Sequence, residues 1–203
     1  MNNTGLILAS QSPRRKYLLE QVGLAFKIIP SQLDEWQVSG SAPDMLVKSL
    51  AEAKAKEVAA SFPGYWIIGA DTIVCIDGEI LGKPDCVDTA RKMLKQLNGK
   101  MHQVFTGYTI CNEALNTVIT DAARTDVYFK GLSRAEIEWY LQTDEPFDKA
   151  GAYAIQGLGM FLVRQIKGSY TNVVGLPVCE VMDHLYRNGA IEPALGGNWR
   201  TCI

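Results

Sequence analysis

The stretch at residues 66–76 constrains the fold more than any other part of the sequence. It is strongly apolar and rich in β-branched residues, and Asp77-Gly78 directly after it is a strong signal for a two-residue hairpin turn. We therefore predict a mostly buried strand that turns back into a second strand at residues 79–81. Asp71 lies in the middle of the stretch. Because a buried carboxylate without a partner is costly, we expect a cation or a metal ion beside Asp71.

The same hairpin offers Lys83 as a partner for that carboxylate. Counted from the predicted turn, Thr72 faces Lys83 across the two strands, and a one-residue bulge would place Asp71 opposite Lys83 instead. Pro84 favours an extended backbone at the preceding Lys83. Either register leaves a lysine near the carboxylate, which fits a functional site as well as a purely structural ion pair.

The segment around Ser10 has the features of an anion-binding site. A short apolar run typical of a buried strand ends at Ser10, and Ser12-Pro13 is a favourable helix start with Ser12 as the N-cap. Free backbone N–H groups at a helix N-terminus attract phosphate, and Arg14 and Arg15 add two permanently charged donors. Cations at the positive end of a helix dipole also require a compensating anion. The alternative is a surface helix start with two solvated arginines.

A long helix is predicted from Pro43 to about Ser61, and Lys54 lies on its apolar side. Lys54 is four residues from both Leu50 and Val58, which belong to the apolar stripe of this helix. A lysine directed toward the core side of a helix usually has a specific partner or ligand. The alternative is that its aliphatic part crosses the apolar edge and its ammonium group reaches solvent.

Two further positions are candidates for a site. Glu35, in a polar segment at residues 31–40 that we predict to be a loop, could hold a divalent cation together with Asp71, since hard oxygen ligands suit magnesium and manganese. The sequence alone does not bring Glu35 and Asp71 together. His102 shares a strand face with Thr106 and could be catalytic, although a hydrogen-bonded structural histidine fits the pattern better.

The order of the predicted elements indicates an α/β protein. Strands and helices alternate in the first part of the chain, whereas the middle has the pattern of antiparallel hairpins; together they predict a mixed sheet flanked by helices. A length of 203 residues, without internal repeats or a linker, favours a single domain. We expect this domain to cover residues 1–191, and residues 192–203, which contain Gly196-Gly197, to form a flexible tail.

The composition excludes several classes of function. The 20 basic and 22 acidic side chains give a formal net charge of −2, which argues against nucleic acid as a partner but leaves a small polyanion open. The five cysteines form no C-x-x-C pair, so neither a zinc site nor a disulfide framework is expected. No signal-peptide pattern and no apolar run of about 20 residues occurs. We therefore expect a cytoplasmic protein without a membrane partner.

Taken in order, these motifs resemble those of the Maf family of nucleotide pyrophosphatases. The resemblance covers the chain to about residue 190. No single motif decides it, but the ordered set is highly specific. Its pieces are Leu8-Ala-Ser-Gln-Ser-Pro-Arg-Arg15, the Glu35 and Lys54 positions, Gly69-Ala-Asp-Thr72, Gly82-Lys-Pro84, His102-x-Val-x-Thr-Gly107, Asp148-Lys-Ala-Gly-Ala-Tyr-Ala-Ile-Gln-Gly157 and Gly168-Ser-Tyr-x-x-Val-Val-Gly-Leu-Pro177.

The resemblance implies hydrolysis of a nucleoside triphosphate to the monophosphate and pyrophosphate with a divalent metal, magnesium or manganese. It implies an elongated mixed α/β fold of the Maf and ITPase-like type, with a substrate cleft across the sheet and often a homodimer. Asp71 resembles the family's proton acceptor or metal-anchoring carboxylate, and Glu35 a metal ligand. The positions that resemble the triphosphate-binding set are Ser10, Arg14, Arg15, Lys54 and Lys83.

Within the family, Gln156 indicates the substrate. The run from Lys149 to Gln156 is similar to the branch that acts on dTTP and UTP, whereas a related branch that acts on 7-methyl-GTP tends to have an acidic residue there. An amide can both donate and accept, which suits the N3–H and carbonyl groups of uracil and thymine. By this resemblance Arg14, Thr72 and Gln156 are the specificity positions. A modified pyrimidine nucleotide, 7-methyl-GTP, and a nucleotide-binding regulator of cell division with little turnover stay open as alternatives.

Overall fold

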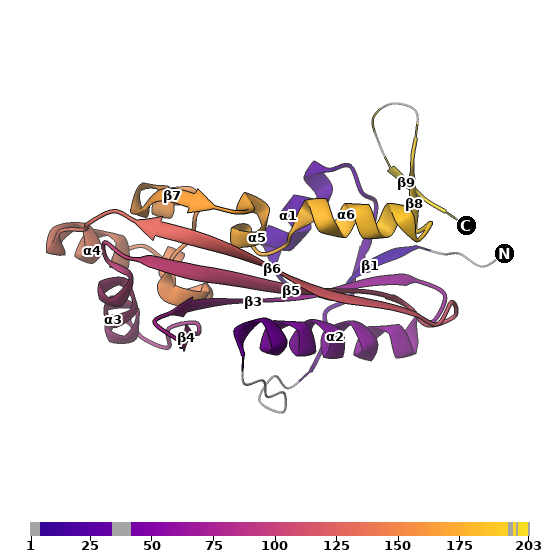
Figure 1. Ribbon diagram of the computed structural model, residues 1–203, viewed down its shortest axis with the longest axis horizontal. Coiled ribbons are helices and arrows are strands. Elements are labelled where there is room, and N and C mark those ends of the chain that lie inside the picture. The colour runs from indigo at the N-terminus through magenta and orange to yellow at the C-terminus, as the bar shows by residue number, and fades with distance from the viewer. Residues whose placement is uncertain (1–4, 34–41, 195–196, 198, 203) are drawn as a thin grey trace. The chain divides into compact units, whose positions relative to one another are not determined.

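The computed structural model describes residues 5–33, 42–194, 197 and 199–202, so Glu35 lies outside the described residues. The strands are β1 (Leu6–Leu8), β2 (Lys27–Ile28), β3 (Trp66–Ile76), β4 (Glu79–Leu81), β5 (Met101–Asn112), β6 (Thr117–Phe129), β7 (Val163–Lys167), β8 (Ile191–Pro193) and β9 (Trp199–Thr201). Within the described residues, seven strands form one sheet in the order β2-β1-β3-β5-β6-β7, with β4 paired to β3, and β8 pairs with β9 (Figure 1).

The sheet is mixed, as predicted. β1 runs parallel to β2 and β3, whereas β4 is antiparallel to β3 and β7 is antiparallel to β6. The helices are α1 (Pro13–Gln21), α2 (Pro43–Ser61), α3 (Val87–Leu97), α4 (Arg134–Leu141), α5 (Tyr170–Val174) and α6 (Val178–Arg187), with 3-10 helices η2 (Glu145–Asp148), η3 (Ala150–Ala152) and η4 (Gly157–Leu162). A mixed sheet flanked by helices confirms the predicted fold class.

The chain divides into two compact units. The first consists of Met1–Asp71, Thr106–Ala123 and Gly175–Ile203, and the second of Thr72–Phe105 and Arg124–Val174. The strands β3, β5 and β6 therefore contribute residues to both units. Residues 192–203, for which we expected a tail, contain β9 and most of β8.

In the first unit, α2 approaches the sheet closely because two strand positions beneath it are glycines. A Cβ atom at Gly69 of β3 would lie 2.8 Å from the Cβ atom of Ala55 and would collide with the carbonyl oxygen of Ala51. A Cβ atom at Gly107 of β5 would lie 2.7 Å from the backbone nitrogen of Lys48. The two glycines therefore let the backbone of α2 contact the strands, along the face where Figure 1 shows this helix.

The opposite face of these strands packs against α6. Side chains alternate between the two faces of a strand, so Tyr108 points away from α2, toward which its neighbour Gly107 is directed. Tyr108 is buried, and its ring centroid lies 5.9 Å from that of His184 in α6. Burial raises the pKa of the Tyr108 hydroxyl, which therefore stays protonated. Helices α2 and α6 thus cover opposite faces of β5 in the first unit.

The second unit has an apolar core of its own. It is built from β3, β5, β6 and β4 together with α3, α4 and the 3-10 segments. The buried members are Val74, Ile76, Leu81, Ala90, Leu94, Leu97, Val104, Val127, Phe129, Leu132, Ile137, Tyr140, Leu141, Ala152, Tyr153 and Leu162. The unit therefore combines residues that are far apart in the sequence.

The hairpin of the second unit has the predicted turn and register. Asp77 and Gly78 have φ values of 52° and 84°, the left-handed conformation that this two-residue turn requires. Val74 pairs with Leu81, as counting from the turn predicts. The strand pair ends there, so Lys83 lies two residues beyond β4 and is not part of the ladder.

Local capping signals account for two of the helix starts. The Ser12 hydroxyl accepts the backbone N–H of Arg15 at 3.4 Å, as expected for the N-cap of α1. Ser133 and Glu136 form a reciprocal capping box at the start of α4. The apolar segment at residues 25–30 contains only the two-residue strand β2, and the small-residue segment at residues 149–159 contains η3.

His102 belongs to the core of the second unit. It is buried, its Nε2 atom lies 2.7 Å from the hydroxyl oxygen of Tyr153, and its ring packs edge-on against Phe129 and Tyr153. Burial lowers the pKa of His102 to about 4, so the imidazole is neutral at neutral pH. This environment favours the structural interpretation of His102 over the catalytic one.

Among the described residues, no helix combines the length and the apolar character needed to cross a lipid bilayer.

We expect Gly69→Ala to lower the free energy of unfolding by about 1–3 kcal/mol, because the added methyl group meets backbone atoms of α2 that cannot move independently. Urea unfolding would show this as a lower midpoint with an unchanged slope. Gly64→Ala is the matched control, since nothing lies within 4 Å of a Cβ atom at Gly64. Equal stability of the two variants would contradict the close packing of α2.

We expect His102 to make the protein less stable as the pH falls from about 6.5 toward 4. In that range the unfolded chain binds a proton on His102 and the folded chain does not, because the folded pKa of about 4 lies below the ordinary value of 6.5. The difference corresponds to roughly 3 kcal/mol at most. Urea unfolding at several pH values should therefore give a flatter curve for His102→Gln. His184→Gln, at the other histidine, is the control, and equal flattening by both variants would contradict this assignment.

Candidate active site

The turn between β1 and α1 holds an arginine against a serine hydroxyl. The backbone N–H of Ser12 donates to Oγ of Ser10 at 3.2 Å, and Nη1 of Arg15 donates to the same atom at 3.0 Å. Nε of Arg15 donates to the carbonyl oxygen of Gly175 at 2.8 Å, which ties the start of α1 to the segment before α6. The guanidinium group is therefore fixed at the N-terminus of α1, beside a buried hydroxyl.

This helix end has a positive electrostatic character. The first turn of α1 contains no acidic residue, and it contains Arg14 and Arg15, both half-buried. The positive end of the helix dipole acts in the same direction as these two charges. The arrangement can bind an anion with several oxygens, and the forked donors of arginine suit phosphate.

A buried ion pair links α2 to β3. Nζ of Lys54 lies 2.7 Å from Oδ1 of Asp71, and the two side chains are only 12% and 13% exposed. The close approach at Gly69 explains the contact, because Asp71 follows two residues later on the same face of β3 and Lys54 follows Ala51 by one helical turn. The cation expected beside Asp71 is thus Lys54, and not the Lys83 that the hairpin suggested. A register argument covers only neighbouring strands, whereas this partner comes from the helix above them.

The pair leaves half of the carboxylate available. Among the described residues, Oδ1 of Asp71 accepts from Lys54, and its Oδ2 atom has no hydrogen-bond partner. An unpaired charge in such a buried position would be costly, and the ammonium group of Lys54 offsets the charge of the carboxylate. The open oxygen can accept a hydrogen bond from water or coordinate a cation.

A divalent metal fits this donor set. The described part of the chain has no group of three or more histidine, cysteine or acidic residues that could hold a metal ion by themselves. Magnesium, however, is usually bound by one or two carboxylates together with water and the phosphates of a substrate. The open oxygen of Asp71 meets that requirement. Glu35, the second expected ligand, lies outside the described residues.

Two expected site residues of the second unit, Lys83 and Gln156, have polar groups that are open to a ligand. Lys83 is exposed and forms no ion pair with any described residue. Gln156 is half-buried, and its side-chain amide has no hydrogen bond within the described residues. Thr72 is half-buried on β3. Lys83 and Gln156 can therefore bind a ligand without first breaking a strong internal contact.

The backbone before Gln156 is tightly constrained. The N–H of Gly151 donates to the carbonyl oxygen of Gly82, the residue before Lys83, at 3.0 Å. Gly151 has a φ value of 71°, and a Cβ atom there would lie 3.1 Å from the side chain of Val74. Ala152 also has a positive φ value, 59°, which is unfavourable for a residue with a side chain. Such strain is often found where a fold holds a functional segment.

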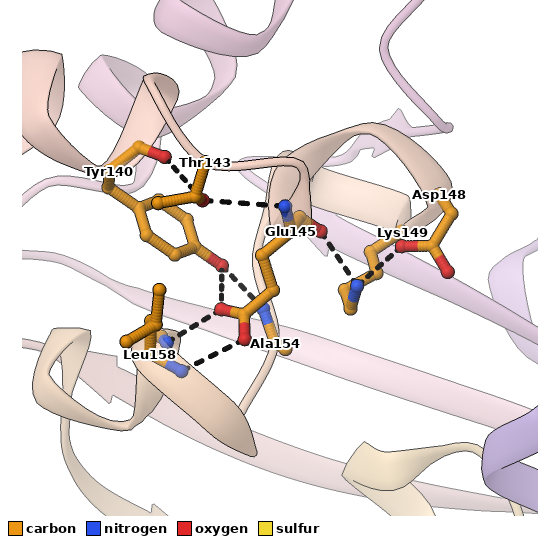
Figure 2. A network of polar contacts seen from close by, with 8 residues as sticks. Tyr140, Thr143, Glu145, Asp148, Lys149, Ala154 and Leu158 are labelled. Carbon is orange, nitrogen blue, oxygen red and sulfur yellow. Dashed lines mark hydrogen bonds and ion pairs between the residues drawn. The ribbon is translucent and has the colours of Figure 1, made fainter.

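Sequence reasoning missed the contacts that hold this segment from the other side. Tyr140 and Glu145 bind backbone groups on both sides of Gln156 (Figure 2). Neither residue belongs to a motif that indicated a site. The partners of Tyr140 and Glu145 are backbone N–H groups. Such groups are present at almost every residue, so the sequence does not reveal these contacts.

Residues 5–188 match the family described as Maf-like protein. The chain is 51% identical over 189 residues to a dTTP/UTP pyrophosphatase of Geotalea uraniireducens (strain Rf4), covering 93% of this chain and 97% of that one. It is 47% identical over 187 residues to a dTTP/UTP pyrophosphatase of Clostridioides difficile (strain 630), covering 92% and 96%. Among solved structures, the Ham1 protein of Staphylococcus aureus shows a weak likeness, with a TM-score of 0.48 and 12% identity over 78% of this chain and 79% of that one. With a family match over most of its length and relatives at about half identity, the chain belongs to the Maf family.

Proposed function

We propose that this protein hydrolyses dTTP and UTP, and by the same chemistry modified pyrimidine nucleotides, to the nucleoside monophosphate and pyrophosphate. The proposal rests above all on the buried pair of Lys54 and Asp71, in a Maf-family chain whose relatives are named dTTP/UTP pyrophosphatase. A carboxylate that is paired with a lysine and keeps one oxygen open can orient or deprotonate a water molecule. That is the group a phosphoanhydride hydrolase needs.

Binding of the triphosphate is assigned to the cations. The N-terminus of α1 offers the Ser10 hydroxyl, the guanidinium groups of Arg14 and Arg15, and the positive end of the helix dipole. Lys54 and Lys83 add two ammonium groups. Charge-assisted hydrogen bonds from such donors are strong, and they strengthen further as negative charge accumulates on the leaving pyrophosphate.

The reaction is a displacement at the α-phosphorus. The water oxygen forms a bond to this phosphorus while the bond to the bridging oxygen breaks, and pyrophosphate leaves with the bonding electron pair. Asp71 accepts the proton of the attacking water through its open oxygen, and Lys54 offsets the charge of the carboxylate. A divalent cation, magnesium or manganese, would be held by Asp71 and Glu35 and would neutralise negative charge on the phosphates.

Base recognition is assigned to Gln156, with Arg14 and Thr72 as further specificity positions. The Gln156 amide can accept the N3–H of uracil or thymine and donate to an adjacent carbonyl. A carboxylate can only accept, which suits the adjacent donors of a guanine edge instead.

The homodimer, the cytoplasmic location and the single domain over residues 1–191 stay predictions of the sequence.

Replacing the candidate base tests the catalytic part of this proposal. We expect Asp71→Asn to lower pyrophosphate release from dTTP and UTP, with magnesium or manganese, by about 10²–10⁴-fold, because an amide cannot take the proton from water. Asp77→Asn is the matched control: Asp77 is an exposed turn residue on the same hairpin, and asparagine tolerates its positive φ value. Full activity of Asp71→Asn would contradict the role of Asp71. If the wild type binds nucleotides tightly but forms no product, the alternative of a nucleotide-binding regulator of cell division is favoured.

Changing the base-binding residue tests the substrate. The kcat/KM values for dTTP, UTP, dCTP, GTP and 7-methyl-GTP should be highest for dTTP and UTP. Gln156→Glu should lower the kcat/KM values for dTTP and UTP by about 10–100-fold. A carboxylate lacks the N–H donor of the amide and would face a carbonyl oxygen of the base. Gln165→Glu, on an exposed position of β7, makes the same chemical change as a control. A wild type that cleaves only 7-methyl-GTP would overturn the base assignment and leave the catalytic one intact.

A further inference from the structure

The carboxylate of Glu145 accepts three hydrogen bonds from parts of the chain around Gln156. Its Oε1 atom accepts the backbone N–H of Leu158 at 2.9 Å, and its Oε2 atom accepts the backbone N–H of Gly159 at 2.7 Å. The Tyr140 hydroxyl donates to Oε2 at 2.8 Å. Figure 2 shows the carboxylate between the tyrosine and the start of η4. The segment that follows Gln156 is thus bound at two successive amides.

The tyrosine extends the same network to the segment before Gln156. The Tyr140 hydroxyl oxygen accepts the backbone N–H of Ala154 at 3.2 Å while its proton is donated to Glu145. Burial, followed by the hydrogen bond to Glu145, raises the pKa of this hydroxyl, so it remains a donor. Gln156 therefore lies between two anchored points, Ala154 on one side and Leu158 on the other.

Gly157 is the residue that permits this arrangement. It has a φ value of 67°, and a Cβ atom there would collide with Oε1 of Glu145 and lie 3.1 Å from its Cδ atom. The residue directly after Gln156 must therefore lack a side chain for the carboxylate to reach the two amides. A glycine after Gln156 is therefore required for two reasons: the Glu145 carboxylate approaches closely at this residue, and the backbone has a positive φ value there.

Glu145 is itself held on both sides. Its backbone carbonyl oxygen accepts from Nζ of Lys149 at 2.7 Å, and its backbone N–H donates to Oγ1 of Thr143 at 3.4 Å. Nζ of Lys149 also pairs with the carboxylate of Asp148 (Figure 2). A carboxylate on such a fixed turn can define the position of the chain that it binds.

We propose that Glu145 and Tyr140 are positioning residues that set the place of Gln156 and thereby the base preference of the enzyme. The inference rests on the proposed function and deepens it. The Gln156 amide can accept the N3–H of uracil or thymine and donate to the adjacent carbonyl oxygen only where it lies at hydrogen-bond distance from both groups. Discrimination requires that the backbone of Gln156 stays at one distance from the base edge. The Glu145–Tyr140 network provides that fixed distance.

The test compares kcat/KM for dTTP and dCTP in Glu145→Gln and Tyr140→Phe. Glutamine keeps the size of Glu145 but replaces one acceptor with an NH₂ group that opposes a backbone N–H, and phenylalanine removes only the hydroxyl. We expect the ratio of the two kcat/KM values to fall about 5–50-fold in both variants. Glu138→Gln is the control, because it removes the ion pair with Arg91 from the same helix as Tyr140 without touching the network. It should lower stability, measured by urea unfolding, and leave the ratio unchanged.

A double-mutant cycle with Gln156→Ala separates positioning from a structural effect. If Glu145 acts through Gln156, Glu145→Gln should not change the ratio further when Gln156 is already alanine. An equal fall of the ratio in both backgrounds, or an unchanged ratio in both single variants, would overturn the positioning role while wild-type activity on dTTP still supported the proposed function. A wild type that releases no pyrophosphate from any nucleotide would overturn the proposed function itself, and the role of Glu145 with it.

Discussion

The close packing of α2 against two glycines is the constraint on which the first unit depends. At Gly69 and Gly107 the strand backbone and the helix backbone meet without a side chain between them. Asp71 lies two residues after Gly69 on the same strand face, so the contact that brings the helix to the strand also brings Lys54 to Asp71. The candidate catalytic pair is therefore positioned by rigid elements and not by a loop, which is the more accurate way to hold reacting groups.

That pairing resolves a conflict in the electrostatics of the proposed reaction. A carboxylate is needed to take a proton from water, but an isolated carboxylate would repel a triphosphate. Lys54 offsets this repulsion at short range, while one oxygen of the carboxylate stays open. Arg14 and Arg15 then add positive charge at a helix end that has no acidic residue in its first turn. The first unit thus combines a base with an attractive field for a polyanion.

Local signals in the sequence predicted the local structure well. The Asp77-Gly78 turn and the Ser12 cap each depend on a few neighbouring residues, and the structure has both. The position of Asp71 predicted a buried charge, but its partner depends on how near α2 lies to β3. That distance follows from packing at Gly69. A single glycine in a strand does not by itself predict that a helix packs against it. The hairpin register therefore pointed to Lys83, the partner that sequence reasoning could reach.

Phosphate recognition and base recognition also differ in how the sequence encodes them. The groups proposed to bind the phosphates are charged side chains, and their residue types can be recognised directly in the sequence. The place of Gln156 depends instead on backbone N–H groups bound by Glu145 and Tyr140, and on the missing side chain of Gly157. Substitutions around such a network can move the amide without changing any residue that contacts the nucleotide. Enzymes with one set of phosphate-binding residues can therefore differ in base preference through positions that never touch the base.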